Sequence, residues 1–310
     1  MQIRNLGGSG LRVSAVGLGC NNFGQRTDLE GSRKVIHKAL DVGITLFDTA
    51  DIYAGMGGSE TVLGTVLGDR RKDIVLATKY SKPMSNDGTK QGASRRYIIE
   101  AVEASLRRLK TDYIDLYQSH RDELETPQNE TLEAFGRLVK AGKVRVIGAS
   151  NYPAPRLAAA LQVSAAHDLP RYESLQPLYN LADREAFERD LAGLCLRENV
   201  GVIPYYGLAA GFLTGKYRSS ADFAKSPRGA RMPAYLNERG LRILAALDAV
   251  AARLHAKPVH VALAWLLQQP AVTAPIASAT NPEQLDDLIT ATRLELDAEA
   301  RRALDAASAA

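Results

Sequence analysis

Cysteine is scarce in this sequence, and its scarcity excludes two kinds of protein. Only Cys20 and Cys195 occur, far apart and without any paired spacing. A disulfide framework or a zinc site needs several cysteines or histidines at short, regular intervals. We therefore expect two reduced thiols, as is usual in a cytoplasmic protein, and no metal site.

Long apolar runs are also missing. No stretch approaches the roughly 20 apolar residues of a membrane helix. The first residues, Met-Gln-Ile-Arg-Asn-Leu-Gly-Gly, lack the charged start and the apolar stretch of a signal peptide. We therefore expect a soluble cytoplasmic protein without a membrane partner.

No block of one charge sign stands out. The 310 residues include 39 Lys and Arg and 35 Asp and Glu, a formal net charge of +4, and the two signs are interspersed. Such a pattern does not indicate nucleic acid as a partner, although a mildly positive pocket for a phosphorylated small molecule is compatible with it. The 45% of hydrophobic residues are enough to bury a sizeable core.

Ionisable residues follow several predicted strands at the point where each strand ends. The apolar run 44–47 stops at Asp48, as a buried strand does when it leaves the core. Tyr53 comes five residues later, in a segment too rich in glycine to continue the strand. Two later predicted strands end in the same way, 74–78 at Lys79 and 113–119 at His120.

The whole chain alternates short apolar runs with amphipathic stretches, which predicts a parallel sheet covered by helices. The strand candidates are a short one beginning at Val16 and the segments 44–48, 74–78, 113–119, 144–149, 172–176, 200–205 and 271–277. The expected helices are 30–42, 59–68, one following Ser94, 127–141, 155–167, 183–198, 240–255 and 258–269.

Two architectures fit eight such strands, a barrel and a doubly wound sheet. A doubly wound sheet gathers its ligand at one switch point, whereas here chemically active residues end strand after strand. The segment Gly17-Leu-Gly19-Cys-Asn-Asn lacks the third glycine of a dinucleotide-binding Rossmann turn. We therefore expect an α/β fold, a (β/α)8 TIM barrel, as a single domain over residues 1–310.

Two additions to this barrel are predicted. Residues 2–6 and 12–16 flank Gly-Gly-Ser-Gly, which indicates an N-terminal β-hairpin. Residues 206–240, after the seventh strand, form a connection too long for an ordinary turn, and long loops in compact domains are generally functional or disordered.

If the barrel brings Asp48, Tyr53, Lys79 and His120 together, they form an apparatus for moving a proton to or from a carbonyl or alcohol oxygen. A lysine ammonium is expected to lower the pKa of Tyr53 from its usual value near 10, and Asp48 to hold that lysine charged. His120 is expected to donate a hydrogen bond from a neutral ring. Because no nucleophile is evident, a nicotinamide hydride fits the missing reactant. A Schiff-base aldolase that uses Lys79 is an alternative.

At these positions the sequence resembles the aldo-keto reductases. The similarity lies in Phe-Asp-Thr-Ala-Asp-Ile-Tyr, in the Lys79 of Ala-Thr-Lys and in Asp-Leu-Tyr-Gln-Ser-His, and it runs from the hairpin to about residue 291. It continues through Gly-Lys-Val-Arg-Val-Ile-Gly-Ala-Ser-Asn at 142–151, residues 176–180, Leu213-Thr-Gly-Lys-Tyr217 and Pro282-Glu-Gln-Leu285.

The resemblance implies a barrel that binds NADP(H) in an extended form, with Asp48, Tyr53, Lys79 and His120 as the catalytic residues. It places the nicotinamide at Ser150, Asn151, Gln176 and the stacking residue Tyr205, and the pyrophosphate under Leu208, Gly211, Leu213, Gly215 and Lys216. It places the adenosine 2′-phosphate at Ser278, Thr280 and Gln284, and the adenine at Asp287. The expected cofactor site also includes Gly19, Cys20, Asn21, Tyr206 and Gly207.

Some positions depart from the family pattern. Tyr206-Gly207 replaces a frequent Ser-Pro, Thr280 replaces a frequent arginine that meets the 2′-phosphate, and Leu288 replaces a frequent asparagine. NAD(H) therefore stays open as an alternative cofactor. The charge that Thr280 lacks could come from the long loop, which carries Arg218, Arg228 and Arg231.

We therefore expect a reductase that converts an aldehyde or ketone to an alcohol, with Tyr53 as the general acid. The alternative is a nucleotide-sensing regulatory subunit on the same fold with weak catalysis. The expected partner is a small-molecule carbonyl substrate, and a homo-oligomer is compatible with the sequence. Candidates for contact with the substrate are Asn21, Asn22, Tyr80 and Arg121.

Overall fold

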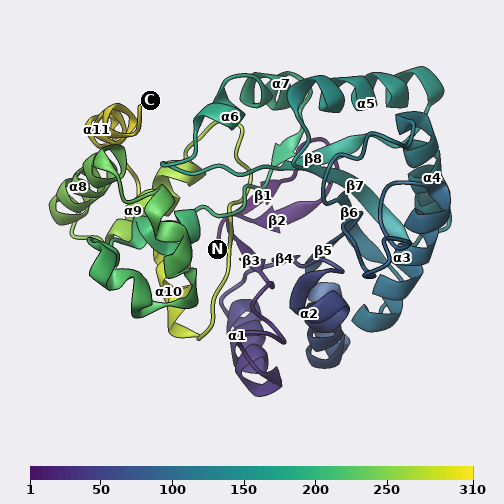
Figure 1. The fold of residues 1–310 in the computed structure, drawn as a ribbon, viewed down its shortest axis with the longest axis horizontal. Helices are drawn as coiled ribbons and strands as arrows, with labels where there is room; N and C mark the ends of the chain where they lie inside the picture. The colour runs from purple at the N-terminus through teal and green to yellow at the C-terminus, as the bar shows by residue number, and fades with distance from the viewer. Residues whose placement is uncertain (310) are drawn as a thin grey trace.

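Eight parallel strands form the centre of the molecule in the computed structural model, which describes residues 1–309. Their order around the sheet is β10-β3-β4-β5-β6-β7-β8-β9. Between the two end strands, the Thr273 amide donates to Val202 O and the Ile276 amide to Pro204 O, each at 2.8 Å. The sheet therefore curls back on itself, and the predicted (β/α)8 fold is confirmed (Figure 1). The strands are β3 (Gly17–Gly19), β4 (Leu46–Asp48), β5 (Val75–Tyr80), β6 (Ile114–Ser119), β7 (Val144–Ser150), β8 (Tyr172–Gln176), β9 (Gly201–Val202) and β10 (Ile276–Ala277).

Helices surround this sheet (Figure 1). α3 illustrates why they form: Ser94 caps its first turn by accepting a hydrogen bond from the Tyr97 amide at 3.3 Å. Its apolar side is buried at Ile98, Val102 and Leu106, as the spacing predicts. The helices are α1 (Leu29–Asp41), α2 (Tyr53–Val66), α3 (Arg95–Leu109), α4 (Gln128–Lys140), α5 (Ala154–His167), α6 (Glu185–Glu188), α7 (Leu191–Arg197), α8 (Glu238–Arg253), α9 (Pro258–Leu267), α10 (Glu283–Ala291) and α11 (Ala298–Ser308).

The predicted β-hairpin is present and closes the amino-terminal end of the barrel. Its strands are β1 (Ile3–Asn5) and β2 (Arg12–Ser14), paired antiparallel. Leu6, Leu11 and Val13 are buried in one cluster with residues of the barrel strands, among them Leu46, Val75, Leu116 and Val146. Gly7 lies so close to the start of β9 that an added Cβ would meet Gly201 N at 2.5 Å, and its φ is +53°. No other residue fits this turn without displacing the hairpin.

Several predicted boundaries are wrong. The strands expected at 200–205 and 271–277 shorten to β9 and β10, because Pro204 and Pro275 carry no amide hydrogen for a ladder. The helix expected at 183–198 breaks into α6 and α7 at Asp190, whose φ is −130°. α2 begins at Tyr53 rather than at 59, although residues 54–57 have non-helical dihedrals.

The carboxyl-terminal part of the chain contains structure that the sequence pattern did not predict. The helices α10 and α11 are additions, and the long connection holds three 3₁₀ segments, η2 (Ala209–Thr214), η3 (Ser220–Lys225) and η4 (Pro227–Ala234). A fourth such segment, η1 (Gly68–Asp73), leads into β5. Within residues 1–309, no helix combines the length and the apolar character that crossing a membrane requires.

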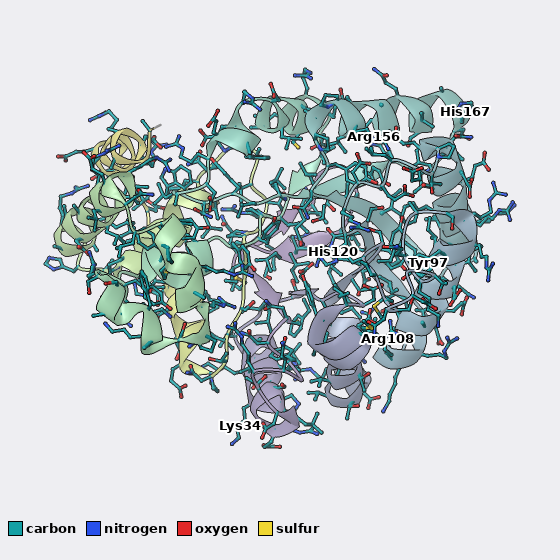
Figure 2. The ribbon with its side chains drawn as sticks, viewed as in Figure 1. Lys34, Tyr97, Arg108, His120, Arg156 and His167 are labelled. Atoms are coloured by element: carbon teal, nitrogen blue, oxygen red, sulfur yellow. The ribbon has the colours of Figure 1, made fainter. Side chains whose placement is uncertain are left out.

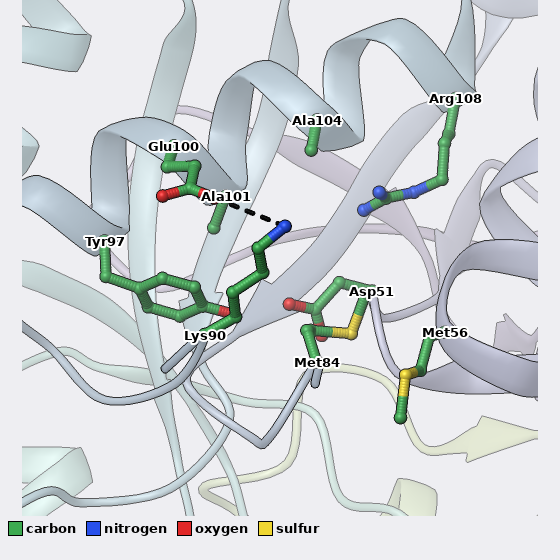
Figure 3. Close-up of a pocket in the computed structure, with 9 residues that line it drawn as sticks. All are labelled: Asp51, Met56, Met84, Lys90, Tyr97, Glu100, Ala101, Ala104 and Arg108. Atoms are coloured by element: carbon green, nitrogen blue, oxygen red, sulfur yellow. Dashed lines mark ion pairs between the residues drawn. The ribbon is translucent and has the colours of Figure 1, made fainter. Parts of the chain in front are cut away.

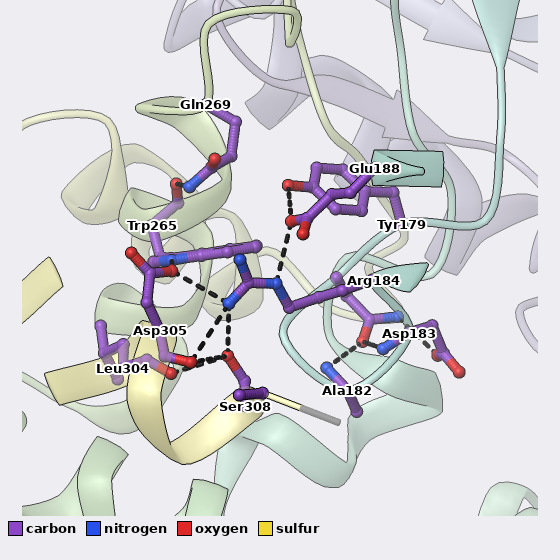
Figure 4. Close-up of polar contacts among 12 residues, drawn as sticks. Tyr179, Ala182, Asp183, Arg184, Glu188, Trp265, Gln269, Leu304, Asp305 and Ser308 are labelled. Carbon is purple, nitrogen blue, oxygen red and sulfur yellow. Dashed lines mark hydrogen bonds and ion pairs between the residues drawn. The ribbon is translucent and has the colours of Figure 1, made fainter. Parts of the chain in front are cut away.

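A polar cluster ties α11 to the body of the fold (Figure 4). Arg184 donates from Nη1 to Asp305 Oδ1 at 3.0 Å and to Ser308 Oγ at 2.7 Å. It also donates from Nε to Glu188 Oε1 at 2.9 Å. The buried Trp265 donates from Nε1 to Asp305 Oδ1 at 3.0 Å. One carboxylate therefore joins α9, α11 and the start of α6.

Candidate active site at the carboxyl ends of the strands

Asp48 and Lys79 meet inside the barrel, at the ends of β4 and β5. Lys79 Nζ donates to both carboxylate oxygens of Asp48, at 2.8 and 2.7 Å, and to Thr49 O at 2.7 Å. Lys79 is fully buried and Asp48 nearly so. Burial lowers the pKa of Lys79, but the neighbouring Asp48 and Tyr53 raise it, and the net direction is upward. The ammonium is therefore held charged although it is buried from bulk solvent.

Two glutamines complete the environment of this carboxylate. Asp48 Oδ1 accepts from Gln176 Nε2 at 2.8 Å and from Gln118 Nε2 at 3.3 Å. Gln176 is one of the predicted cofactor residues, whereas sequence reasoning missed Gln118. The signal for Gln118 was its place on β6 two residues before His120, because alternate residues of a strand point to the same side.

Tyr53 stands at the start of α2, beside both Lys79 and His120. Lys79 Nζ lies 5.3 Å from the centre of the Tyr53 ring. The rings of Tyr53 and His120 meet edge to face, with centres 5.8 Å apart. The fold therefore brings together all four residues predicted to be catalytic, which come from three strand ends and one helix.

The expected lowering of the Tyr53 pKa is wrong in its net direction. Burial raises the pKa of Tyr53 and Asp48 adds to this, while the positive charge of Lys79 lowers it by less. Burial favours the neutral phenol, because the hydration free energy that a tyrosinate loses is larger than the stabilisation that it gains from the charge of Lys79. Tyr53 therefore holds its proton at neutral pH.

His120 follows β6 and carries a neutral ring, as expected. Burial, reinforced by Lys79, Lys82 and Arg121, lowers its pKa to about 2. Its Nδ1 atom is buried and has no hydrogen-bond partner within residues 1–309. Figure 2 shows His120 near the middle of the molecule. A neutral imidazole can donate one hydrogen bond and accept another.

The residues expected at the nicotinamide lie next to these groups. Asn151 Nδ2 donates to His120 O at 3.0 Å, and Asn151 Oδ1 accepts from Tyr205 OH at 2.8 Å. Ser150 Oγ donates to Gln176 O at 2.9 Å. The ends of β7 and β8 and the segment after β9 therefore place Ser150, Asn151, Gln176 and Tyr205 side by side.

The residues expected at the pyrophosphate fold into a compact turn around η2. At Gly211, whose φ is +99°, an added Cβ would lie 3.3 Å from Lys216 Nζ. Leu213 is fully buried, so its contact with a ligand stays a prediction. Leu208 packs against the main core and Gly207 lies against Leu266, while Gly215 ends η2 with a φ of +79°.

The residues expected around the adenosine follow β10 or lie on α10, and Ser278 contacts the loop after β3. Ser278 Oγ donates to Asn21 Oδ1 at 2.6 Å, and an added Cβ on Gly19 would meet Ser278 Oγ at 2.6 Å. Cys20 lies between Gly19 and Asn21 in the sequence. Its side chain is buried, and burial raises the pKa of the thiol well above the usual value. Gln284 Oε1 accepts from the Thr280 amide at 2.8 Å.

Asp287, expected at the adenine, is already paired. Its Oδ1 accepts from Lys257 Nζ and lies against His260 Nε2, each at 2.9 Å. Both partners belong to or adjoin α9. Asp287 therefore fixes α10 to α9, and its contact with a ligand stays a prediction.

Arg228 lies close to Arg26, Arg231 and Tyr206, and none of these three arginines forms an ion pair among residues 1–309. Arg231 Nη1 donates to Tyr206 OH, and the guanidinium lies 5.0 Å from the centre of that ring. Burial lowers the pKa of Arg228, and the charges of Arg26 and Arg231 act in the same direction. Arg218, by contrast, is held by both oxygens of Asp248 at 2.7 and 2.8 Å. Nothing in the sequence pattern singled out Arg26, which lies in the loop after β3.

The metal-binding side chains offer no comparable cluster. Among residues 1–309, no group of three His, Cys, Asp or Glu could hold an ion. The polar groups at this end of the barrel include the phenol of Tyr53, the imidazole of His120, the amides of Asn151 and Gln176 and the guanidinium groups of Arg228 and Arg231. This set suits an organic ligand with phosphate groups.

Comparison with known proteins places this geometry in context. Residues 15–309 match the model of the Aldo/keto reductase family. The chain is 37% identical to the "Uncharacterized oxidoreductase YrpG" of Bacillus subtilis (strain 168), over 98% of this chain and 95% of that protein. It is 33% identical to the L-glyceraldehyde 3-phosphate reductase of Escherichia coli (strain K12), over 94% and 87%. It is also 33% identical to the "Probable voltage-gated potassium channel subunit beta" of Arabidopsis thaliana, over 93% and 90%.

Proposed function

Because the chain belongs to the Aldo/keto reductase family, we propose that it is an NADPH-dependent reductase that converts an aldehyde or a ketone to an alcohol. The observation that carries this proposal is the meeting of Asp48, Tyr53, Lys79 and His120 at the carboxyl ends of three strands. Barrel enzymes of this architecture use that end for chemistry.

The residues at the barrel mouth fit a nicotinamide dinucleotide. The amide and hydroxyl groups of Ser150, Asn151 and Gln176 would hold the carboxamide, and Tyr205 would stack on the ring. Arg231 and Arg228, unpaired with any carboxylate among residues 1–309, are suited to the negative charge of phosphate groups. Phosphate recognition by these arginines favours NADPH, and NAD(H) is the alternative cofactor.

The four side chains have separate parts in the proposed reaction. Bound NADPH supplies the hydride. Tyr53 donates its hydroxyl proton to the substrate oxygen, and the raised pKa described above ensures that it has a proton to give. His120 donates a hydrogen bond from its neutral ring to the same oxygen.

Lys79 acts after the proton has left. Its buried ammonium, 5.3 Å from the Tyr53 ring centre, stabilises the tyrosinate by charge attraction, which bulk solvent screens little at a buried position. Asp48 holds this ammonium in position through two hydrogen bonds of 2.8 and 2.7 Å. Gln118 and Gln176 orient Asp48.

The test is the Tyr53→Phe variant, which keeps the ring and removes the proton. We expect NADPH binding, measured by calorimetry, to stay nearly unchanged and turnover with a panel of aldehydes to fall by about 100-fold or more. Tyr113→Phe is the matched control, because Tyr113 lies under Arg71 and Arg145, away from the site. Retained turnover in Tyr53→Phe would refute the acid role.

A second function is favoured by the relative named as a potassium channel subunit beta. On that reading the chain would sense a nucleotide and regulate a partner, with weak catalysis. The two functions separate on one measurement, the rate of NADPH oxidation across a carbonyl panel. Rapid turnover of any member supports the reductase, whereas tight NADPH binding without turnover supports the regulatory subunit.

A further inference from the structure

A second pocket lies beside α3, and none of the four proposed catalytic residues lines it. Its volume is about 200 Å³, more than ten times the roughly 10–15 Å³ that one water needs. Figure 3 shows its lining, and Figure 2 shows two of the lining residues, Tyr97 and Arg108, to one side of His120. The pocket is lined by Asp51, Met56, Met84, Lys90, Tyr97, Glu100, Ala101, Ala104 and Arg108.

Asp51 is the unusual member of this lining. The residue is 1% exposed, and within residues 1–309 neither of its carboxylate oxygens has a hydrogen-bond partner. Burial raises its pKa to about 8, with the charge of Glu60 acting in the same direction and those of Arg108 and Lys79 opposing it. A buried carboxylate without a partner is costly, so such groups are normally paired.

The other charged groups around the pocket are already paired. Glu100 Oε1 lies 3.7 Å from Lys90 Nζ. Arg108 Nε donates to Glu60 Oε2 at 2.7 Å, and Glu60 Oε1 accepts from Thr78 at 2.6 Å. The charges of Lys79, Lys82 and Arg108 act on Asp51, but no side chain among residues 1–309 donates a hydrogen bond to its carboxylate oxygens. A ligand with a positive charge and N–H donors would supply both the missing donors and a counter-charge.

The rest of the lining is suited to an apolar body. Met56 and Met84 place thioethers on the pocket, and Ala101 and Ala104 leave room along α3. Tyr97 contributes an aromatic ring, which attracts a cation over its face. Met56 is 43% exposed, and flexible methionine side chains adapt to a ligand at low cost.

We propose that this pocket binds a small organic ammonium, with the charged nitrogen at Asp51 and a short alkyl body between the two methionines. This binding is separate from the proposed reductase activity. Asp51 is also linked to the catalytic centre, because its backbone N–H donates to Lys79 O at 3.1 Å.

The test uses the methionines as reporters. The chain has four, of which Met56 and Met84 line the pocket while Met1 and Met232 do not. The protein is labelled with ¹³C on the methionine methyl groups and titrated with n-butylammonium chloride. We expect the resonances of Met56 and Met84 to shift with saturation, and those of Met1 and Met232 to stay in place. 1-Butanol and potassium chloride are the neutral and inorganic probes, and neither should produce the shift.

The affinity should depend on pH with a defined sign. Binding requires the ionised Asp51 carboxylate, whose pKa in the free protein is about 8, while an alkylammonium stays charged up to about pH 10. The affinity for n-butylammonium should therefore rise about tenfold per pH unit from pH 6 towards pH 8 and then level off.

Two variants test the site itself. Asp51→Asn removes the charge and should weaken binding at pH 8 by at least about tenfold, and Ala104→Leu should block it by filling the pocket without changing a charge. The exposed Asp112→Asn is the matched control and should bind as the wild type does. If Asp51→Asn does not fold, Ala104→Leu and the pH dependence decide. The proposal fails if the two methionines do not shift, if 1-butanol or potassium chloride shifts them equally, or if both variants bind normally.

Discussion

Lys79 Nζ lies 2.8 and 2.7 Å from the two carboxylate oxygens of Asp48, and both residues are buried. The attraction between the two charges offsets the hydration free energy that each loses on burial. The pair therefore contributes to the stability of the fold as well as to the proposed catalysis, and the two contributions can be measured separately.

Replacing one partner should destabilise the fold. Asp48→Asn leaves a buried ammonium without a counter-charge, and we expect the free energy of unfolding, measured by urea denaturation, to fall by about 3 to 5 kcal/mol. The double variant Asp48→Asn with Lys79→Met removes the unpaired charge and should recover most of this loss. Equal destabilisation of the single and double variants would show that the unpaired Lys79 charge is not the cause of the lost stability.

The rate of carbonyl reduction should be insensitive to pH near neutrality. The pKa of His120 is lowered to about 2, so its ring does not gain a proton between pH 5 and 8. The pKa of Tyr53 is raised, so the acid keeps its proton there and loses it only at more alkaline pH. We expect a flat profile of kcat/KM from about pH 5 to 8, with a decline only above about pH 10.

The His120→Gln variant is the control for this pH profile of kcat/KM. His120→Gln keeps a neutral donor and should lower kcat/KM without adding or removing a limb of the pH profile. A limb near pH 6.5 in the wild type, absent from His120→Gln, would show that the histidine titrates in the ordinary range and that its ring is not held neutral.

Arg231 should separate NADPH from NADH. The guanidinium lies against Tyr206 with no carboxylate partner among residues 1–309, so it is free to meet a phosphate. Arg231→Leu should weaken NADPH binding by about tenfold or more, because a hydrogen bond to a charged group is worth about 1.5 to 3 kcal/mol. NADH binding should change far less.

Arg218→Leu is the comparison for this variant. Arg218 is on the same loop but is occupied by Asp248 at 2.7 and 2.8 Å, so its loss should leave the ratio of the NADPH and NADH dissociation constants unchanged. Calorimetric titration of both variants with both nucleotides measures this ratio. An equal loss of affinity for the two nucleotides in Arg231→Leu would assign that residue to a part of the cofactor that both share.

Much of the fold was predictable because its strands are buried on both sides. β5 is buried at all six positions and begins with the apolar run 75–77. β6 is also buried at all six positions, although Asp115, Gln118 and Ser119 are polar. Local signals failed where tertiary contacts decide. α11 is held by Arg184 and Trp265, which are distant in sequence, and β9 and β10 are shortened by prolines inside otherwise apolar runs.

The candidate site was predictable to the extent that it lies at strand ends. Asp48, Lys79 and His120 each follow an apolar run, so the barrel alone brings them together. Arg26 and Asp51 gave no such signal. Arg26 gains its neighbours from a loop some 200 positions later in the chain, and Asp51 differs from an ordinary turn carboxylate only because α2 and α3 remove it from water. The direction of the Tyr53 pKa was mistaken for the same reason, because the depth of burial is a property of the folded chain.

The β-hairpin closes the amino-terminal end of the barrel, because Leu6, Leu11 and Val13 pack against residues of the barrel strands. A ligand of the proposed site would therefore approach from the opposite end, where β4, β5 and β6 finish. The first fourteen residues thus set the direction of approach, although they lie far from the proposed chemistry.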